Sequence, residues 1–195
     1  VVTIEDPIEY VFEDERAIID QREVYRDTLS FARALRSTFR QDPDVIMVGE
    51  MRDSETVSTA ITAAETGHLV FGTLHTTSAA KTIDRIIDVF PAEEKAMVRS
   101  MLSESLQGVI SQTLLKKKGG RRVAAHEIML GTGAIRNLIR EDKVAQMHSA
   151  IETGSSQGMN TLDQCLNDLI DKALISYEQA REKAAKPTNF FEPEG

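Results

Sequence analysis

Residues 44–53 read DVIMVGEMRD and form the most informative stretch of the chain. The four residues before Gly49, from Val45 to Val48, are all apolar, as in a central parallel strand that is covered on both faces. Two further apolar runs also read as strands, and segments with helical periodicity lie between them. The expected strands are 1–4, 45–48 and 69–74. Residues 11–26 are charged and irregular and are expected to form a loop or a hairpin, after which Asp27 is expected to cap a helix with Leu29 on its apolar face. This alternation of strand and helix predicts an α/β fold with a mostly parallel sheet.

Polar, titratable side chains follow each of the three expected strands. Glu5 and Asp6 follow the first strand, Glu50 follows the second and His75 follows the third. In open parallel α/β sheets, ligands bind at the carboxyl ends of the strands. We therefore expect these side chains to gather at one edge of the sheet and to form a site.

The position of Glu50 fits a Walker B segment, in which an apolar strand delivers one carboxylate at its end. That acid holds Mg²⁺, directly or through water, opposite the β and γ phosphates of a nucleotide. Gly49 between the apolar run and the acid is atypical of the motif. The alternative is an ordinary strand that ends in a surface acid.

A second acidic segment, TIEDPIEY at residues 3–10, places Glu5, Asp6 and Glu9 close together. A hydrolytic motor needs a carboxylate that orients or deprotonates a water in line with the γ phosphate. It also needs oxygen ligands that complete the Mg²⁺ shell. The alternative interpretation is a solvated acidic turn.

The third segment, GHLVFGTLHTT at residues 67–77, has His68 and His75 on either side of a strand. A histidine in such a place can donate a hydrogen bond to the γ phosphate or to the attacking water, although a structural role is the alternative. No third ligand recurs at ligand spacing, so no zinc site is expected.

The sequence contains no phosphate-binding loop. Such a loop needs glycines, a lysine and a following Ser or Thr, and no Gly-Lys dipeptide occurs anywhere in the 195 residues. Carboxylates cannot replace the loop, because they repel the phosphates. We therefore expect this chain alone to bind ATP weakly or not at all. Because Val1 opens directly on a strand-like run, the chain reads as beginning in the middle of a domain.

The composition narrows the class of protein. Lysine and arginine number 23 against 31 acids, so the net charge is −8, and only 5% of the residues are aromatic. Both values argue against a nucleic-acid motor, which needs clustered cations and stacking rings. One cysteine, Cys165, allows no internal disulfide and indicates a reducing compartment. No apolar run reaches the ~18 residues of a membrane span.

The second half of the chain reads as mostly helical. A helix is expected at 94–115 and a strand at 122–129, with the basic turn Lys116 to Arg122 between them. Ser176 and Gln179 form a capping box for the last helix. We predict a core domain at 1–130, a helical bundle at 131–186 and a disordered tail at 187–195. The other helices are expected at 134–141, 142–153, 161–172 and 177–185.

The three segments, in this order and spacing, resemble the C-terminal half of the secretion-superfamily ATPases (type II–IV secretion traffic ATPases). The resemblance extends to about residue 185. Residues 134–141, which read AIRNLIRE, and residues 158–166, which read GMNTLDQCL, are similar to the pilus retraction branch. The resemblance implies part of a RecA-like P-loop NTPase core with ATP and Mg²⁺ as cofactors.

The resemblance also implies a homo-hexameric motor. It would be cytoplasmic, peripheral to the inner membrane at the pilus base, and would work with the pilus platform protein there. It would couple ATP hydrolysis to type IV pilus retraction and twitching motility, with no nucleic-acid partner. An accessory retraction paralogue and a pilus-assembly or type II secretion ATPase remain alternatives, but Cys165 stands alone where assembly and type II enzymes carry four cysteines.

Roles carried over from the family assign most of the residues above. Glu50 matches the Walker B acid that holds Mg²⁺, and Glu9 matches the general base, with Glu5 or Asp6 as the alternative. Arg52 is expected to act across a subunit interface. Nucleotide and Mg²⁺ binding is assigned to Glu5, Asp6, Glu50 and Arg52, and catalysis to Glu9, Glu50, His68 and His75. The retraction helix is Ala134, Ile135, Arg136, Asn137, Leu138, Ile139, Arg140 and Glu141.

Overall fold

The computed structural model describes residues 1–191, which divide into two compact units. The first, here called the sheet unit, contains Val1–His75 and Arg85–Ser105. The second, the hairpin unit, contains Thr76–Asp84 and the described residues from Leu106 onward. None of the helices in the described part of the chain is both long and apolar enough to cross a membrane.

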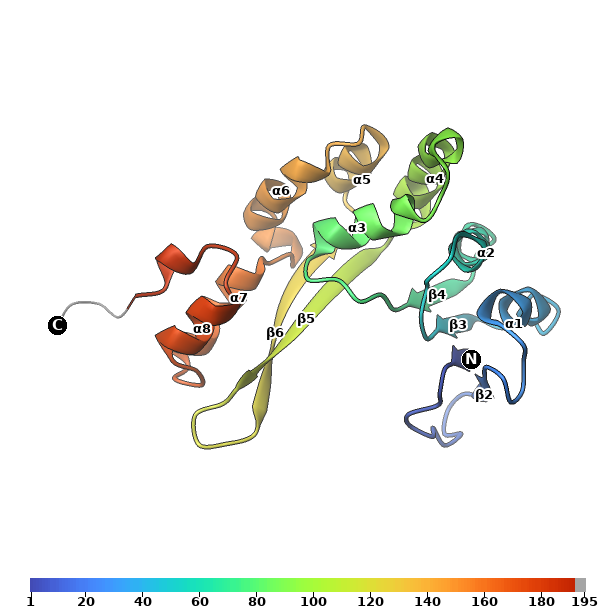
Figure 1. Cartoon of the computed structure of the whole chain (residues 1–195), viewed down its shortest axis with the longest axis horizontal. Helices are drawn as coiled ribbons and strands as arrows, with labels where there is room; N and C mark the ends of the chain where they lie inside the picture. The colour runs from blue at the N-terminus through green and yellow to red at the C-terminus, as the bar shows by residue number, and fades with distance from the viewer. Residues whose placement is uncertain (192–195) are drawn as a thin grey trace. The chain divides into compact units, whose positions relative to one another are not determined.

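Six strands and eight α-helices make up the described chain (Figure 1). The strands are β1 (Val2–Glu5), β2 (Asp20–Glu23), β3 (Val45–Val48), β4 (Leu69–Gly72), β5 (Gly108–Lys116) and β6 (Arg122–Leu130). The helices are α1 (Phe31–Thr38), α2 (Ser54–Glu65), α3 (Ala79–Asp88), α4 (Ala92–Ser105), α5 (Gly133–Arg140), α6 (Met147–Thr153), α7 (Leu162–Asp171) and α8 (Tyr177–Lys183). Three 3₁₀ turns are η1 (Val144–Gln146), η2 (Ser155–Gln157) and η3 (Pro187–Asn189).

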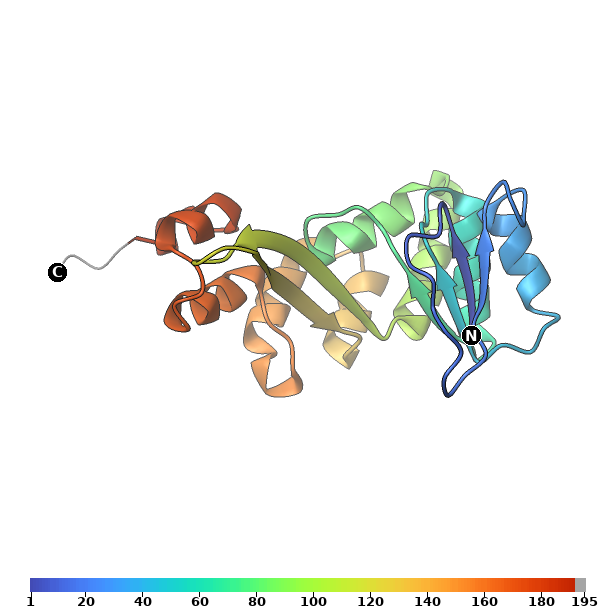
Figure 2. The same cartoon turned by 90° about the horizontal axis from the view of Figure 1, so that it is seen from below.

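The sheet unit is built on four parallel strands in the order β2-β1-β3-β4 (Figure 2). This confirms the predicted α/β fold with a parallel sheet. Ile4, Ile46 and Val48 are buried in the sheet, and α1 and α2 pack beside them. Burying each such side chain stabilises the fold by ~1.5–3 kcal/mol. The core cluster consists of Ile4, Val24, Ala34, Leu35, Ile46, Val48, Ala60 and Ala63.

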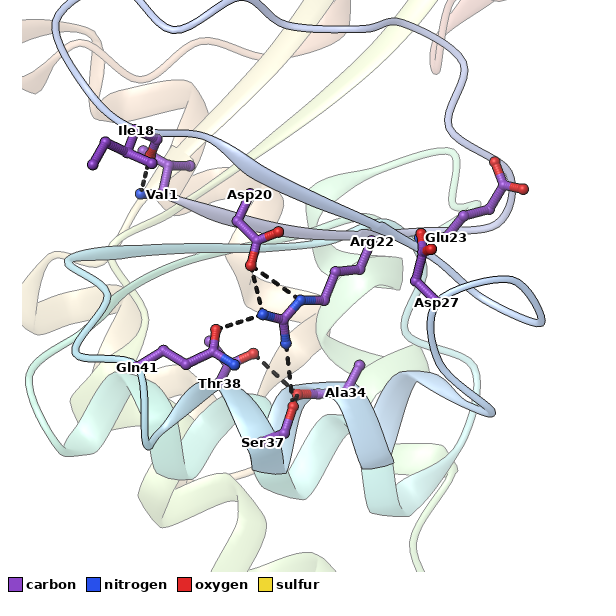
Figure 3. Close-up of polar contacts among 10 residues, drawn as sticks. All are labelled: Val1, Ile18, Asp20, Arg22, Glu23, Asp27, Ala34, Ser37, Thr38 and Gln41. Atoms are coloured by element: carbon purple, nitrogen blue, oxygen red, sulfur yellow. Dashed lines mark hydrogen bonds and ion pairs between the residues drawn. The ribbon is translucent and has the colours of Figure 1, made fainter.

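Strand β2 lies in a segment, residues 11–26, for which the sequence predicts a loop or a hairpin. It instead pairs in parallel with β1, with Val2 opposite Asp20. Figure 3 shows how side chains hold this polar edge strand against α1. Arg22 Nη2 donates to Asp20 Oδ2 at 2.5 Å and to Gln41 Oε1 at 2.6 Å, and its Nη1 donates to Ser37 Oγ at 3.3 Å. The prediction failed because the strand is held by polar contacts that leave no apolar pattern.

Helix α1 begins later than expected. The sequence places its cap at Asp27, but Ser30 is the residue whose side chain accepts the Arg33 N–H, at 3.2 Å. Asp27 instead accepts the Glu23 N–H at 2.9 Å and closes the turn after β2. Leu29, expected on the apolar face, therefore lies outside the helix and is exposed.

The hairpin unit contains an antiparallel pair, β5 and β6, in register from Gly108 opposite Leu130 to Lys116 opposite Arg122. The sequence predicts the strand at 122–129 correctly, but its helix at 94–115 is wrong after residue 105. Helix α4 ends at Ser105 and β5 begins at Gly108. Val109 and Ile110 extend the apolar stripe of the preceding helix and do not alternate as a strand would, so only the pairing with β6 selects the strand.

Helices α7 and α8 pack with this hairpin. Their shared core cluster consists of Leu115, Ala125, Leu166, Leu169, Ile175, Ala180 and Phe190. The predicted capping box of α8 is confirmed, with Ser176 accepting the Gln179 N–H and Gln179 accepting the Ser176 N–H. The helix expected at 142–153 is shorter, because the 3₁₀ turn η1 precedes α6.

The end of the described chain differs from the disordered tail expected at 187–195. Residues 187–189 form the turn η3, and Phe190 is fully buried in the cluster with α7 and α8. Phe190 thus packs this short segment against the hairpin unit's core, and Asp163 accepts the N–H groups of Ala185 and Lys186 just before it. Residues 192–195, which belong to the same prediction, lie outside the described residues. The predicted domain boundary after residue 130 stays a prediction.

Candidate functional site

The carboxyl ends of β1, β3 and β4 lie at one edge of the sheet, because the three strands are parallel neighbours. Glu5 is the last residue of β1, and Glu50 follows β3 by two residues. His75 follows β4 by three residues. The structure therefore brings these elements together as the sequence predicts.

Gly49 allows β3 to end close against β1. A Cβ atom at this position would lie 2.8 Å from the Ile4 carbonyl oxygen and 3.1 Å from Glu5 Cα. The Gly49 N–H instead donates to that Ile4 oxygen at 2.7 Å. The glycine that is atypical of a Walker B segment thus has a steric reason here, and it sets Glu50 beside the end of β1.

Two loops at this edge are tied to each other through Thr73. The Thr73 N–H donates to Val48 O at 3.2 Å, and Thr73 O accepts the Met51 N–H at 3.0 Å. The Thr73 hydroxyl also donates to Gly49 O. These bonds fix the loop after β3, which carries Glu50, to the loop after β4, which carries His75. The sequence analysis did not single out Thr73.

Glu50 has two basic partners. Arg52 Nη2 donates to its Oε2, and His75 Nε2 lies 3.6 Å from its Oε1. The Glu50 side chain is only 18% exposed, whereas the side chains of Arg52 and His75 are 63% and 85% exposed. The carboxylate is thus held at the base of the site, and its two partners extend into solvent.

These partners keep Glu50 ionised. The hydrogen bond from Arg52 is the main reason that the pKa of Glu50 lies below its ordinary value, and the charges of Arg52 and His75 add to it. Reciprocally, the bond to Glu50 raises the pKa of Arg52. A carboxylate with a lowered pKa is a weak base, so this environment favours binding of a cation over proton abstraction.

Glu5 is buried, and its carboxylate is occupied. Its Oε1 accepts from Thr3 Oγ1 at 2.6 Å and from Gln21 Nε2 at 2.9 Å. Asp6 and Glu9, in contrast, are exposed after the strand. Of the three acids in this segment, Glu5 is therefore the one already engaged in holding the sheet.

Residues of β2 shape the acidic loop and were missed by sequence reasoning. Gln21 Nε2 donates to Tyr10 O at 2.9 Å as well as to Glu5. Glu23 Oε2 accepts the Ile8 N–H at 3.1 Å. No sequence pattern identifies these contacts, because β2 itself was not predicted.

His68 is not brought together with Glu50. It precedes β4, whereas His75 follows that strand, so the two histidines flank a strand about 13 Å long. His68 Nδ1 lies 3.0 Å from Ala63 O, and its ring lies 5.8 Å from the ring of Phe39. The structure places His68 in a structural environment, which leaves its predicted catalytic role without a neighbour in the site.

The AIRNLIRE segment forms α5, capped by Thr132. Ile135 and Ile139 are fully buried, and Ala134, Asn137 and Arg140 are exposed. The remaining residues lie between these extremes or at the helix end. Leu138 is half-buried, Arg136 Nε donates to Gly131 O at 2.7 Å, and Glu141 pairs with Lys143 at 2.6 Å. The helix predicted at 134–141 is thus present, with its isoleucines buried and its polar side chains mostly exposed.

The described residues contain no group of three or more His, Cys, Asp or Glu side chains arranged to hold a metal ion. Glu50 alone supplies one oxygen donor at the strand end, which fits a Mg²⁺ ion that obtains its other ligands from phosphates and water. A separate groove of ≈ 460 Å³ lies beside β2 and α1, with Arg22, Arg26 and Asp27 in its wall. None of Glu50, Arg52 and His75 lines that groove.

The chain is similar in sequence to proteins of bacterial pili. It is 74% identical over 190 residues to the type IV pilus retractation ATPase PilT of Pseudomonas aeruginosa, covering 97% of this chain and 55% of that protein. It is 62% identical to a twitching motility protein of Neisseria gonorrhoeae, covering 94% and 50% of the two chains. The chain thus spans about half the length of the curated relatives it matches.

Solved structures agree with these relatives. The crystal structure of the pilus retraction motor PilT with bound ADP matches with a TM-score of 0.88 and 54% identity, over 97% of this chain and 53% of that chain. The ATPase DotB of Legionella pneumophila matches with a TM-score of 0.82 and 32% identity, over 93% and 50%. The family model for type II/IV secretion system proteins matches residues 1–150. The chain therefore belongs to the type II/IV secretion system protein family.

Proposed function

We propose that the intact protein is an ATPase that drives disassembly and retraction of type IV pili, and that this chain supplies the Mg²⁺-binding and water-activating part of its site. The observation that carries the proposal is the ionised Glu50 beside Arg52 and His75 at the carboxyl edge of the sheet. The 74% identity to a pilus retraction ATPase supports the reaction and its use.

In the proposed mechanism, Glu50 would hold Mg²⁺, and the bound ion would supply positive charge that offsets the phosphate charge of ATP. Arg52, which donates to the same carboxylate, would be released when Glu50 holds the ion, and its guanidinium would then stabilise phosphate charge at a subunit interface. The exposed His75 reaches the γ phosphate or the attacking water. ATP and Mg²⁺ are the cofactors.

Glu9 is proposed as the general base that takes the proton of the attacking water. The exposure of Glu9 supports this choice over Glu5, whose carboxylate already accepts two hydrogen bonds. Asp6 is also exposed and remains the alternative. His68 is dropped from the proposed mechanism, because its ring lies at the other end of β4.

The phosphate-binding loop is proposed to come from a part of the intact protein outside these residues. Strand β4 lies at the edge of the described sheet, and its Leu69 and Phe71 side chains are exposed, as expected of a strand that another segment covers. The relatives' greater length supports the same conclusion. The isolated chain is therefore expected to have little or no ATPase activity.

The proposed assembly is a homo-hexameric ring in the cytoplasm, attached at the inner membrane through the pilus platform protein. Its subunits contain a core at 1–130 and a helical region at 131–186. The exposed side chains of α5, namely Ala134, Asn137 and Arg140, are available to pass force from the ring to the pilus machinery. A retraction motor is favoured over the accessory paralogue, since identity to PilU of Pseudomonas aeruginosa is only 42%.

The test is Glu50→Gln in the full-length protein, with ATP turnover and nucleotide affinity both measured. Turnover should fall at least 100-fold, because the ionised Mg²⁺ ligand is lost, while ATP still binds. Glu55→Gln is the matched control, since Glu55 pairs with Arg36 on the exposed surface of α2. Unchanged turnover in the Glu50 variant would contradict the proposal.

The same assay separates the candidate bases. Glu9→Gln should abolish turnover, whereas Glu5→Gln should leave part of it. If only the Glu5 variant is inactive, Glu5 is the base.

A further inference from the structure

Glu127 is a buried carboxylate that the proposed mechanism does not use. Its side chain lies on β6 and the residue is only 7% exposed. Its Oε1 accepts the backbone N–H of Ala79, the first residue of α3, at 2.7 Å. The two residues are 48 positions apart in the sequence, and Ala79 is fully buried. Burying a carboxylate costs free energy unless hydrogen bonds compensate for its lost hydration. The bond from Ala79 provides such compensation and ties α3 to β6.

The contact caps part of the N-terminus of α3. The first N–H groups of a helix have no partner within the helix. Ser78 Oγ accepts the Lys81 N–H at 3.2 Å, and Ser78 O accepts the Thr82 N–H at 3.0 Å. Glu127 accepts the Ala79 N–H, and its negative charge suits the positive end of the helix dipole.

The first turn of α3 in turn holds the segment that carries His75. Thr76 Oγ1 lies 2.7 Å from Thr82 Oγ1, and Lys81 Nζ donates to Thr77 Oγ1 at 3.2 Å. Each residue from Thr76 to Ser78 is therefore bonded to residues of this turn. His75 is the residue immediately before this fixed segment.

The residues on either side of Glu127 in β6 are held by contacts with the segment that contains Asn160 and Cys165. The neighbouring His126 donates its N–H to Cys165 Sγ at 3.4 Å, and its carbonyl accepts from Asn160 Nδ2 at 2.7 Å. Ile128 donates its N–H to Asn160 O at 2.9 Å. The acceptor for Ala79 is thus held by β6 and by the segment that leads into α7.

We propose that Glu127 is a positioning residue for hydrolysis: by fixing the first turn of α3 to β6, it fixes the Thr76–Ser78 segment that presents His75. The inference rests on the role of His75 in the proposed ATPase. Glu127 acts through this segment and touches no reacting group.

The first test measures local opening and needs no activity. Hydrogen exchange of the amides at 76–82 is compared in full-length wild type, Glu127→Ala and Glu127→Gln. Loss of the buried acceptor should speed exchange of this segment ~10–100-fold in the alanine variant. The glutamine variant keeps an oxygen that can accept the Ala79 N–H, so most of the protection should return.

The matched control is Asp163→Ala. Asp163 is another buried carboxylate of the hairpin unit, 9% exposed, and it accepts the N–H groups of Ala185 and Lys186 at 2.7 and 2.9 Å. This variant should lose comparable thermal stability while exchange at 76–82 stays at the wild-type rate. Faster exchange at 76–82 in the Asp163 variant would assign the effect to general destabilisation.

The second test measures steady-state turnover of the same full-length variants. Glu127→Ala should lower kcat ~10-fold or more with KM for ATP little changed, and Asp163→Ala should keep the wild-type kcat. In the His75→Ala background, Glu127→Ala should not lower kcat further, because Glu127 acts on the reaction only through the position of His75.

Two results would overturn the inference: exchange at 76–82 that Glu127→Ala leaves unchanged, or effects of Glu127→Ala and His75→Ala that simply multiply. Should Glu127→Ala fail to fold, Glu127→Gln and Glu127→Asp carry the same comparison. Failure of the proposed function is distinguishable, since it would appear as absent ATPase activity in the wild type, whatever the exchange experiment shows.

Discussion

At the scale of single residues, Glu50 and Arg52 determine the charge of the site. The hydrogen bond from Arg52 lowers the pKa of Glu50 below its ordinary value. The Arg52 guanidinium and the Glu50 carboxylate both lie at the strand end where a cation would bind. The charge of Asp6 also acts on Arg52, so this arginine offsets negative charge from two acids. If Glu50 holds a metal ion as proposed, the affinity for that ion would depend on displacing Arg52.

Arg52→Ala should make the stability of the protein less dependent on acid. The folded pKa of Glu50 lies below its unfolded value, so the pair stabilises the fold fully above the unfolded pKa and progressively less as pH falls through the folded pKa. The difference in unfolding free energy between wild type and Arg52→Ala should therefore be largest near neutral pH and should shrink through the acidic range. Urea unfolding at several pH values measures it.

A control for this experiment is Arg26→Ala, since Arg26 contacts Asp27 only at 4.0 Å on an exposed surface. A pH-independent difference for Arg52→Ala would show that Arg52 contributes only by packing. Direct titration of the Glu50 carboxyl carbon by NMR should also show its pKa moving upward in the Arg52 variant.

The sequence was enough to predict which residues lie at the ends of strands, but it did not predict the contacts that their side chains make. The apolar run 45–48 was enough to place Glu50 at the end of a strand. The occupied carboxylate of Glu5 was not foreseeable, since its partner Gln21 stands on a strand with no apolar pattern. The separation of His68 from His75 follows from their positions on either side of one strand. The catalytic role predicted for both histidines came from the family resemblance.

At the scale of elements, the approach of β1 to β3 depends on Gly49. Gly49→Ala would place a methyl group 2.8 Å from Ile4 O and 3.1 Å from Glu5 Cα, both of them backbone atoms that cannot move aside. The strands must separate, so we expect a loss of ~1–3 kcal/mol in unfolding free energy. Denaturant unfolding measures the loss, and turnover of the full-length protein should fall as Glu50 shifts.

Gly133→Ala is the matched control for this substitution. No atom lies within 4 Å of a Cβ added at Gly133, which starts α5. Its stability should be unchanged or higher by up to ~1 kcal/mol. Equal stabilities for the two variants would mean that the strands adapt without cost and that Gly49 is not required there.

The secondary structure shows which local signals are reliable. The Ser176 and Gln179 capping box was read correctly, because its bonds are local to the sequence. The helix predicted over β5 is wrong, because Val109 and Ile110 continue a helical apolar stripe and the strand is decided by pairing with β6. Non-local pairing is the physical information that a single sequence lacks.

At the scale of the whole molecule, the described residues hold the carboxylates and the histidine of the proposed nucleotide site, and the sequence contains no phosphate-binding loop. The likeness to the ADP-bound PilT motor over half of that chain supports the view that the site is completed elsewhere in the intact protein. Hydrolysis is thus proposed as a property of the assembled motor. Within it, this chain would set the geometry of metal, water and γ phosphate.

The most direct test locates the nucleotide's metal ion. In full-length protein with labelled histidines, Mn²⁺ replaces Mg²⁺ together with a nucleotide, and paramagnetic broadening of each histidine NMR signal is measured. We expect much stronger broadening of His75, whose Nε2 lies 3.6 Å from Glu50 Oε1, than of His68 at the other end of β4. Equal broadening of the two histidines, or stronger broadening of His68, would contradict it.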